Sequence, residues 1–226
     1  VWQEDDVNAP FVDANGQTNG KTNGEVYKVK PGNSKYVDVN KDGVYNDADQ
    51  GIIGCGQPTF NWGWNNTFNY KNFDFSFFVV GFHGFDIYNA THQMGYNLIK
   101  SQQMAGVTPM RELLNRWTPT NTNTDIPGFV KGGTENKDFF STRFVENGSF
   151  IKMKSITLGY TLPEATCRSL GINNLRVYAS VQNPFHITKY SGLDPEATMG
   201  SPLVQGVDWG AYPNSRNYLI GLNFSF

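Results

Sequence analysis

A twelve-residue stretch, Asp38 to Asp49, places oxygen-bearing side chains at the spacing of a calcium-binding loop. Oxygens fall at positions 1, 3, 5, 9 and 12, and Gly43 occupies position 6, where the backbone must bend. Because Ca²⁺ takes about six to eight hard oxygen ligands, short acidic and amide side chains around such a bend can wrap one ion. The predicted ligands are the side chains of Asp38, Asn40, Asp42, Asn46 and Asp49 and the main-chain carbonyl of Val44.

This loop departs from the usual calcium pattern in two ways. Asp49 stands where a bidentate Glu is usual, and no helix obviously flanks the loop. The alternative interpretation is a loop rich in Asx turns that binds no metal. We predict a calcium ion in a structural role and no catalytic cofactor.

The remaining chemistry-bearing residues form no catalytic constellation. His83, His92 and His186 lie far apart in different expected elements, and the sequence has no GxSxG motif and no P-loop. Cys55 and Cys167 show neither the spacing of a zinc site nor that of a disulfide framework. The sequence therefore predicts that this chain is not an enzyme.

Composition narrows the classes of protein further. Of the 226 residues, 15% are aromatic, and the formal net charge is -2 without any Lys/Arg cluster. The absence of a basic patch argues against nucleic-acid binding, which depends on many contacts to phosphates. No run of about 18 apolar residues is present, so a membrane role would have to be played by strands. No signal peptide opens the sequence, and we expect an N-terminal part to be missing or removed.

Several segments alternate apolar and polar residues, which predicts strands with one apolar and one polar face. In residues 59–70, for example, Phe60, Trp62 and Trp64 alternate with Asn61 and Gly63. The expected strands are 59–70, 73–83, 149–162, 175–187 and 217–226. The sequence thus predicts an all-β fold.

The last segment carries the strongest alternation. One face holds Tyr218, Ile220, Leu222, Phe224 and Phe226, and the other is polar except for Leu219. Outer-membrane barrel strands are about 9 to 11 residues long, apolar toward lipid and polar toward the lumen. A terminal aromatic residue after such alternation also resembles the signal by which the barrel-assembly machinery recognises its clients. The alternative is the last strand of an ordinary β-sandwich.

The lengths of the connections give an independent indication. If residue 226 is periplasmic, residues 71–72 and 163–174 form periplasmic turns, and residues 1–58, 84–148 and 188–216 form extracellular loops. Short links inside and long links outside are the pattern of outer-membrane barrels. Scattered helical spacing between residues 88 and 117 predicts one or two helices within the second loop. Cys55 and Cys167 would lie on opposite sides of the membrane and could not pair.

Taken together, these segments resemble the C-terminal part of the SusC/RagA-type TonB-linked outer-membrane transporters of Bacteroidetes. The resemblance covers nearly the whole chain from about residue 36. The stretches that carry it are 36–43, 53–60, 73–84, 116–127, 150–163, 175–183, 189–195 and 218–226.

The resemblance implies a large plugged barrel of about 22 strands. It also implies a SusD-like surface lipoprotein that caps the barrel and binds glycan or peptide, and a TonB complex that acts on the plug. The plug domain is absent from this chain. We therefore expect residues 1–58 to be an extracellular loop and residues 59–226 the C-terminal part of the barrel, working in uptake of oligomeric nutrients, glycans first and peptides second.

A physical argument leads to the same expectation. Five strands leave two open edges, which hydrocarbon does not tolerate because every backbone polar group there must be paired. The chain must then be one piece of a longer polypeptide embedded in a lipid bilayer.

Three loop aromatics, Trp117, Trp209 and Tyr212, are candidates for stacking on sugar rings, although packing inside the loops explains them equally well. The rival function is a secreted, calcium-stabilised, carbohydrate-binding β-sandwich. A glycosidase ranks third, because no carboxylate pair can be nominated.

Overall fold

The computed structural model describes residues 1–96, 109–128, 140–199 and 204–225. The chain divides into two compact units. The first comprises Val1–Ile53 and Thr91–Ser141, and the second comprises Gly54–Ala90 and Thr142–Phe226.

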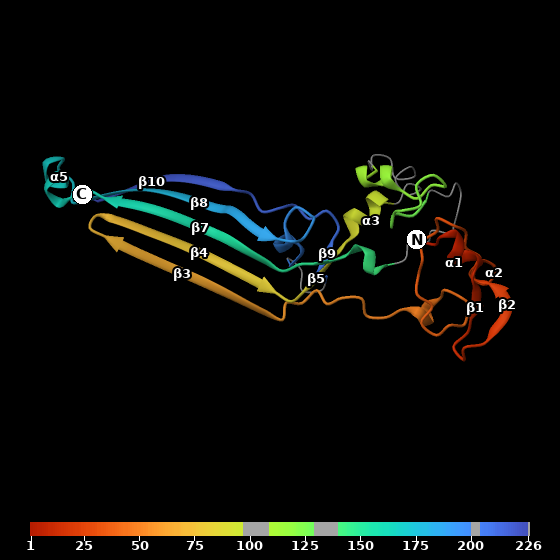
Figure 1. Cartoon of the computed structure of the whole chain (residues 1–226). Coiled ribbons are helices and arrows are strands. Elements are labelled where there is room, and N and C mark those ends of the chain that lie inside the picture. The colour runs from red at the N-terminus through yellow and green to blue at the C-terminus, as the bar shows by residue number, and fades with distance from the viewer. Residues whose placement is uncertain (97–108, 129–139, 200–203, 226) are drawn as a thin grey trace. The chain divides into compact units, whose positions relative to one another are not determined.

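The second unit contains one five-stranded sheet in which every neighbouring pair is antiparallel (Figure 1). The order across the sheet is β10-β8-β7-β4-β3. The strands are β3 (Phe60–Tyr70), β4 (Phe73–His83), β7 (Phe150–Thr161), β8 (Asn174–Thr188) and β10 (Asn217–Ser225). Each of them overlaps one of the segments in which the sequence alternates.

The short connections all lie at one end of this sheet. β3 and β4 are joined by Lys71 and Asn72, and β7 is joined to β8 by a link that contains α5 (Glu164–Ser169). The register places these links beside the end of β10, since Ser225 pairs with Asn174. The two long connections, 84–149 and 189–216, leave from the opposite end (Figure 1).

A β-bulge interrupts β7 at Lys154. Ser155 lies opposite Phe78, whereas Met153 lies opposite Val79, so Lys154 is an extra residue in this strand. A bulge shifts the side-chain alternation by one residue. It therefore puts Lys152 on the same face as Ser155. An unbroken alternation would place residues 152 and 155 on opposite faces.

A small sheet and a compact core lie where the long connections begin. β5 (Asp86–Asn89) pairs with β6 (Val145–Asn147) and, in parallel, with β9 (Val207–Asp208). The adjoining 3₁₀ turns are η3 (Thr142–Phe144) and η4 (Pro195–Met199). The buried cluster beside them consists of Phe85, Ile87, Phe150 and Tyr190. In the described part of the chain this core covers only one end of the five-stranded sheet.

The first unit has regular elements that the alternation pattern did not predict. They are α1 (Glu4–Asn8), β1 (Pro10–Val12), β2 (Thr18–Thr22), α2 (Asn23–Tyr27), η1 (Asp47–Asp49) and η2 (Arg111–Asn115). A capping box between Thr22 and Glu25 fixes the start of α2. The rings of Phe11 and Tyr45 pack against Tyr27, so this loop has a small aromatic core.

Of the helices expected between residues 88 and 117, α3 (Ala90–Tyr96) and η2 are observed, and residues 97–108 lie outside the described part of the chain. None of the helices among the described residues has the length and apolar character needed to cross a membrane.

Candidate functional site

One face of the five-stranded sheet is largely apolar from end to end, with Asn66 of β3 and His83 of β4 among the exceptions, and we call it the apolar face. Cross-strand pairing puts the alternating apolar residues of all five strands on the same side. Its members in the two outer strands include Phe60, Trp64, Phe68 and Tyr70 of β3 and Tyr218, Ile220, Leu222 and Phe224 of β10. Ile220 is 85% exposed and Tyr218 is 71% exposed. An apolar surface of this extent marks a site of contact with another molecule or with lipid.

Aromatic rings occupy both ends of this face in the outer strands. In β3 they are Phe60 and Tyr70, and in β10 they are Tyr218 and Phe224, with Ile220 between them. In β10 aliphatic residues separate the two rings, whereas β3 also carries Trp64 and Phe68 between its ends. Aromatic rings at both ends of the apolar band are typical of outer-membrane strands, where they sit at the two membrane interfaces.

The opposite face, the polar face, carries a charge pair that reaches across a whole strand. Arg176 of β8 donates from Nε to Asp74 Oδ1 at 2.9 Å and from Nη2 to Asp74 Oδ2 at 2.5 Å. Gly159 of β7 lies between them, and a Cβ there would collide with atoms of both side chains. The Arg176 guanidinium also lies over the ring of Tyr178, 4.9 Å from its centroid.

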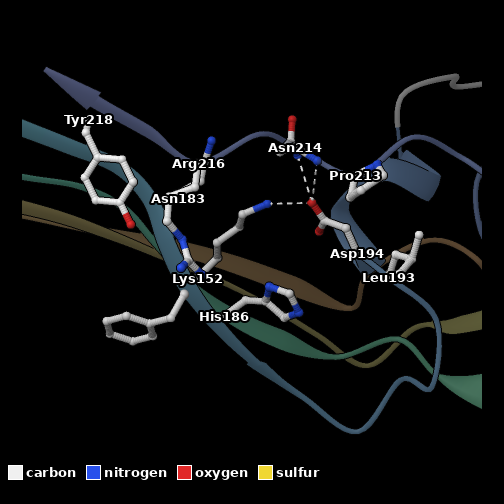
Figure 2. A pocket seen from close by; sticks show the side chains of 10 residues that line it. Lys152, Asn183, His186, Leu193, Asp194, Pro213, Asn214, Arg216 and Tyr218 are labelled. Atoms are coloured by element: carbon white, nitrogen blue, oxygen red, sulfur yellow. Dashed lines mark hydrogen bonds and ion pairs between the residues drawn. The ribbon is translucent and has the colours of Figure 1, made fainter.

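A second charge cluster lies on the polar face near the long connections, and we call it the lysine cluster. The Lys152 side chain is 2% exposed, and its ammonium group donates to Asp194 at 2.8 Å and to Glu196 at 2.7 Å. Lys154 also pairs with Glu196, and Asn214 donates to both carboxylates. Figure 2 shows Lys152 and Asn214 converging on Asp194. The cluster ties the 189–216 connection to β7.

The cluster controls the ionisation of its buried acid. Burial raises the pKa of Asp194, but hydrogen bonds from Lys152 and from the Asn214 amide outweigh that effect and hold the pKa below its ordinary value. The Tyr190 hydroxyl, which donates to Asp208 at 2.5 Å, has a raised pKa because it is buried and faces a carboxylate.

In the predicted calcium loop, the Asp38 carboxylate holds the bend. Its Oδ2 accepts from the Gly43 amide at 2.8 Å and from the Tyr27 hydroxyl at 2.9 Å. Its Oδ1 is buried and accepts no hydrogen bond within the described part of the chain. Hydrogen bonds from the Asn46 and Val39 amides hold the pKa of Asp49 below its usual range, and the Asp38 carboxyl group also interacts with Asp49. Two facing carboxyl groups and a buried acceptor without a donor favour a cation.

Other features of the loop weaken that assignment. Asp42 accepts from Val44 and Asn40, and Asn46 accepts from Ala48, as in Asx turns. Among the described residues, no group of three His, Cys, Asp or Glu side chains converges as a metal site. A carboxylate oxygen has lone pairs for both an amide and a cation, so these bonds do not prevent ligation.

The three candidate sugar-stacking residues differ in their surroundings. The ring of Trp117 lies against Gly32, where a Cβ would clash with it, and its Nε1 donates to Gln3 at 3.2 Å. Trp209 is 56% exposed and Tyr212 is 90% exposed. Trp117 thus has a packing role within the first unit, while the rings of Trp209 and Tyr212 are accessible.

The residues of the expected assembly signal, Tyr218, Ile220, Leu222 and Phe224, share the exposed apolar face of β10, and Phe226 lies outside the described residues. Cys55 is exposed, Cys167 is buried, and both thiols are free.

The two charge clusters of the polar face were not predicted from the sequence. The one signal for the lysine cluster was that Lys152 and Lys154 interrupt the alternation of β7 at the bulge. Asp74 and Arg176 stood in polar positions of two expected strands, but their pairing depends on the register of three strands.

A scan against models of known protein families finds no match. Among curated proteins, the chain is similar to TonB-dependent receptor P3 of Formosa agariphila, with 36% identity over 202 residues that cover 87% of this chain and 19% of that protein. It is also similar to TonB-dependent receptor SusC of Bacteroides thetaiotaomicron, with 32% identity over 199 residues that cover 87% of this chain and 18% of that protein. The chain thus spans about one fifth of the length of the curated relatives it matches.

Solved structures agree with these matches. The RagAB peptide importer in its closed-closed state matches 95% of this chain and 20% of that chain, with a TM-score of 0.66 and 25% identity. Another structure of the RagAB peptide transporter matches 76% of this chain and 17% of that chain, with a TM-score of 0.63 and 28% identity. The predicted all-β class is confirmed in its coarser form, as open sheets with a few short helices. The chain is therefore a segment homologous to the SusC/RagA-type TonB-dependent receptors of Bacteroidetes.

Proposed function

We propose that this chain forms part of a transmembrane β-barrel that imports oligomeric nutrients. Receptors of this family reside in the bacterial outer membrane and are transporters, not enzymes. The observation that carries the proposal is the single-layered sheet, apolar on one face and charged on the other. A soluble sheet would bury its apolar face under a second layer. Lipid on one side and an aqueous lumen on the other suit both faces.

The two edge strands of the sheet need neighbouring strands to pair with. β3 and β10 are the outer strands of this sheet, and each pairs with a neighbour on one side within the described residues. In hydrocarbon the other edge of each strand must also be paired. The remaining strands of the same barrel, surrounding a plug domain, would supply that pairing.

The link lengths support an orientation. The links at the α5 end of the sheet would face the periplasm, and residues 1–58, 84–148 and 188–216 would face the outside, as in other outer-membrane barrels. The buried cluster of Phe85, Ile87, Phe150 and Tyr190 would hold the external loops in place where they join the sheet.

The nutrient would be an oligomer, glycan or peptide, delivered by a SusD-like lipoprotein and moved by the TonB complex acting on the plug. The likeness to the RagAB peptide importer supports a peptide. The exposed rings of Trp209 and Tyr212 would offer stacking surfaces to either class.

The Asp38–Asp49 loop would bind Ca²⁺ in a structural role. Asp38, Asn40, Asp42, Asn46 and Asp49 would supply side-chain oxygens and Val44 its carbonyl. The buried, donor-free Asp38 Oδ1 and the facing Asp49 carboxyl group support this proposal. Binding would neutralise two adjacent negative charges and stiffen the bend at Gly43.

The rival β-sandwich needs a second sheet over the apolar face. In the part of the chain that is described, the other two sheets have two and three short strands, and Tyr218, Ile220 and Leu222 stay exposed. The described residues therefore offer no second sheet that could cover the apolar face.

The proposal can be tested with two adjacent substitutions in the full-length receptor. Ile220 lies on the apolar face and its neighbour Leu219 on the polar face. Ile220→Arg would put a charge into lipid at a cost of about 2–4 kcal/mol near the midplane and should deplete folded receptor in outer-membrane fractions. Leu219→Arg should be assembled normally. Equal assembly of both variants would contradict the proposal.

A further inference from the structure

A cavity of about 400 Å³ lies where β10 begins, between β8 and the end of the 189–216 connection (Figure 2). It exists because β8 runs past β10: Asn217 pairs with Gln182, while residues 183–188 continue beyond that point. Asn183, in the left-handed conformation with φ of 49°, donates its side-chain amide to the Ser215 carbonyl and so shapes the edge of the cavity.

The cavity carries an unbalanced positive charge. The two ammonium groups of the lysine cluster are matched by the Asp194 and Glu196 carboxylates. Arg216 also lines the cavity, and within the described part of the chain its guanidinium has no carboxylate partner. His186 adds two ring nitrogens to the same lining. An anion entering the cavity would thus find an available guanidinium.

The cavity also opens toward the apolar face. Phe185 and Tyr218 line it, and both are on the apolar face of the sheet, 49% and 71% exposed. Figure 2 shows Tyr218 on one side of the lining and Asp194 on the other. A ligand held here would contact exposed aromatic rings and the cation together.

We propose that this cavity binds the phosphate of an anionic glycolipid in the outer leaflet of the membrane. The inference rests on the proposed function, because the orientation given there puts the start of β10 at the outer interface. Tyr218 would then lie in the aromatic girdle, at the level where lipid headgroups meet the acyl chains. The Arg216 guanidinium offers a planar fork of donors that matches a phosphate, and basic pockets at this depth bind lipid headgroups.

Lys152 and Arg216 have different roles in the cavity because one is buried and the other is exposed. Lys152 is already satisfied by two carboxylates and buried, so it serves as a wall of the cavity and not as a ligand. Arg216 is exposed and lies one residue before β10, where a long side chain can reach up to the phosphate while Tyr218 stays in the interface.

The test measures glycolipid bound to the full-length receptor. Wild type, Arg216→Gln and Arg216→Lys are purified in detergent, incubated with diphosphoryl lipid A, and the lipid retained per receptor is counted by native mass spectrometry. Arg216→Gln should retain about tenfold less, the loss expected for one charge-assisted contact. Arg216→Lys should retain an intermediate amount, which would separate loss of charge from misfolding.

Controls distinguish the possible outcomes. Arg168→Gln removes the same charge from the exposed α5 link and should leave retention unchanged. Dephosphorylated lipid A should bind wild type and Arg216→Gln equally weakly, and millimolar inorganic phosphate should not displace the bound lipid. Displacement would assign the cavity to free phosphate, and undiminished retention by Arg216→Gln would overturn the proposal outright. With either of these two results, a receptor that still assembles in the membrane and imports its nutrient would leave the proposed function standing, and only the glycolipid proposal would fail.

Discussion

Asp74 and Arg176 join β4 to β8 across the intervening strand β7, directly over Gly159. The two hydrogen bonds, 2.9 and 2.5 Å, are possible because Gly159 has no side chain to separate the partners. The charge pair and the glycine therefore act as one unit on the polar face of the sheet.

Replacing Gly159 with Ala should break this unit. The added Cβ would collide with the ends of both flexible side chains, so they would move apart and the paired hydrogen bonds would be lost. We expect Gly159→Ala and Asp74→Asn each to destabilise the folded receptor by about 1 kcal/mol. The double variant should be no worse than either single one. Thermal unfolding followed by heat-modifiable gel mobility measures this, with Gly51→Ala, in open space, as the control. Additive losses would show that the three residues are independent.

Lys152 should matter far more than its neighbour Lys154. Lys152→Met would leave Asp194 and Glu196 without their buried cation, which costs about 3–5 kcal/mol. Lys154 is half-buried and, among the described residues, forms an ion pair with Glu196 but not with Asp194, so Lys154→Met serves as the matched control. Limited proteolysis of intact receptor should release the 189–216 connection in the first variant and spare it in the second. Equal resistance of both variants to proteolysis would show that the lysine cluster does not anchor the connection.

The lysine cluster also predicts that the 189–216 connection loses its attachment to β7 at low pH. The pKa of Asp194 is lowered in the folded protein from its ordinary value of 3.8, so its ionised form contributes stability above that pH and loses it as pH falls through the folded value. Cleavage of the connection by pepsin, measured relative to cleavage of an unfolded substrate at the same pH, should rise only below about pH 3.8, and it should not change with pH in the acid range above that point. In Asp194→Asn the acid-induced step should disappear. A step near neutral pH would point to another group.

Calcium binding can be followed with terbium. Terbium takes the same oxygen ligands as Ca²⁺, and its luminescence would be sensitised by Tyr27, beside the loop, and by Tyr45, within the loop, whose stacked ring centroids lie 4.8 Å apart. The full-length receptor should give a signal that excess Ca²⁺ removes. Asp38→Asn should weaken terbium binding by about tenfold or more, whereas Asp13→Asn, in a separate Asx turn of the same unit, should not. Luminescence that Asp38→Asn leaves unchanged would exclude the loop as the site.

The alternating pattern was sufficient to predict where the five long strands lie. Phe60 to Tyr70 and Asn217 to Ser225 alternate strictly enough that period two could not be mistaken for a helix. The pattern failed at Lys154, because one extra residue in a strand leaves no distinct mark among residues of mixed polarity. The burial of Lys152 could not be foreseen for the same reason.

Features that depend on register were beyond sequence reasoning. The bridge between Asp74 and Arg176 requires three strands in one alignment, and the cavity beside Arg216 exists only because β8 outruns β10. The Asp38–Asp49 loop is the opposite case, since the ligands that it would offer to Ca²⁺ are local and their spacing is visible in the sequence; calcium binding itself stays a prediction. What spacing could not give was the burial of Asp38 Oδ1 or its approach to Asp49.

The proposed function requires that the apolar face of the sheet meets hydrocarbon. Spin labels attached to single cysteines at Leu219 and Ile220, in a receptor with Cys55 and Cys167 replaced by Ser and reconstituted in vesicles, test it directly. Because these neighbours point to opposite faces, the label at 220 should be relaxed by lipid-soluble oxygen and shielded from a water-soluble nickel complex, and the label at 219 should not show this preference. A label at 220 that both reagents fail to reach would mean that the face is buried in protein, which would contradict a membrane-spanning sheet.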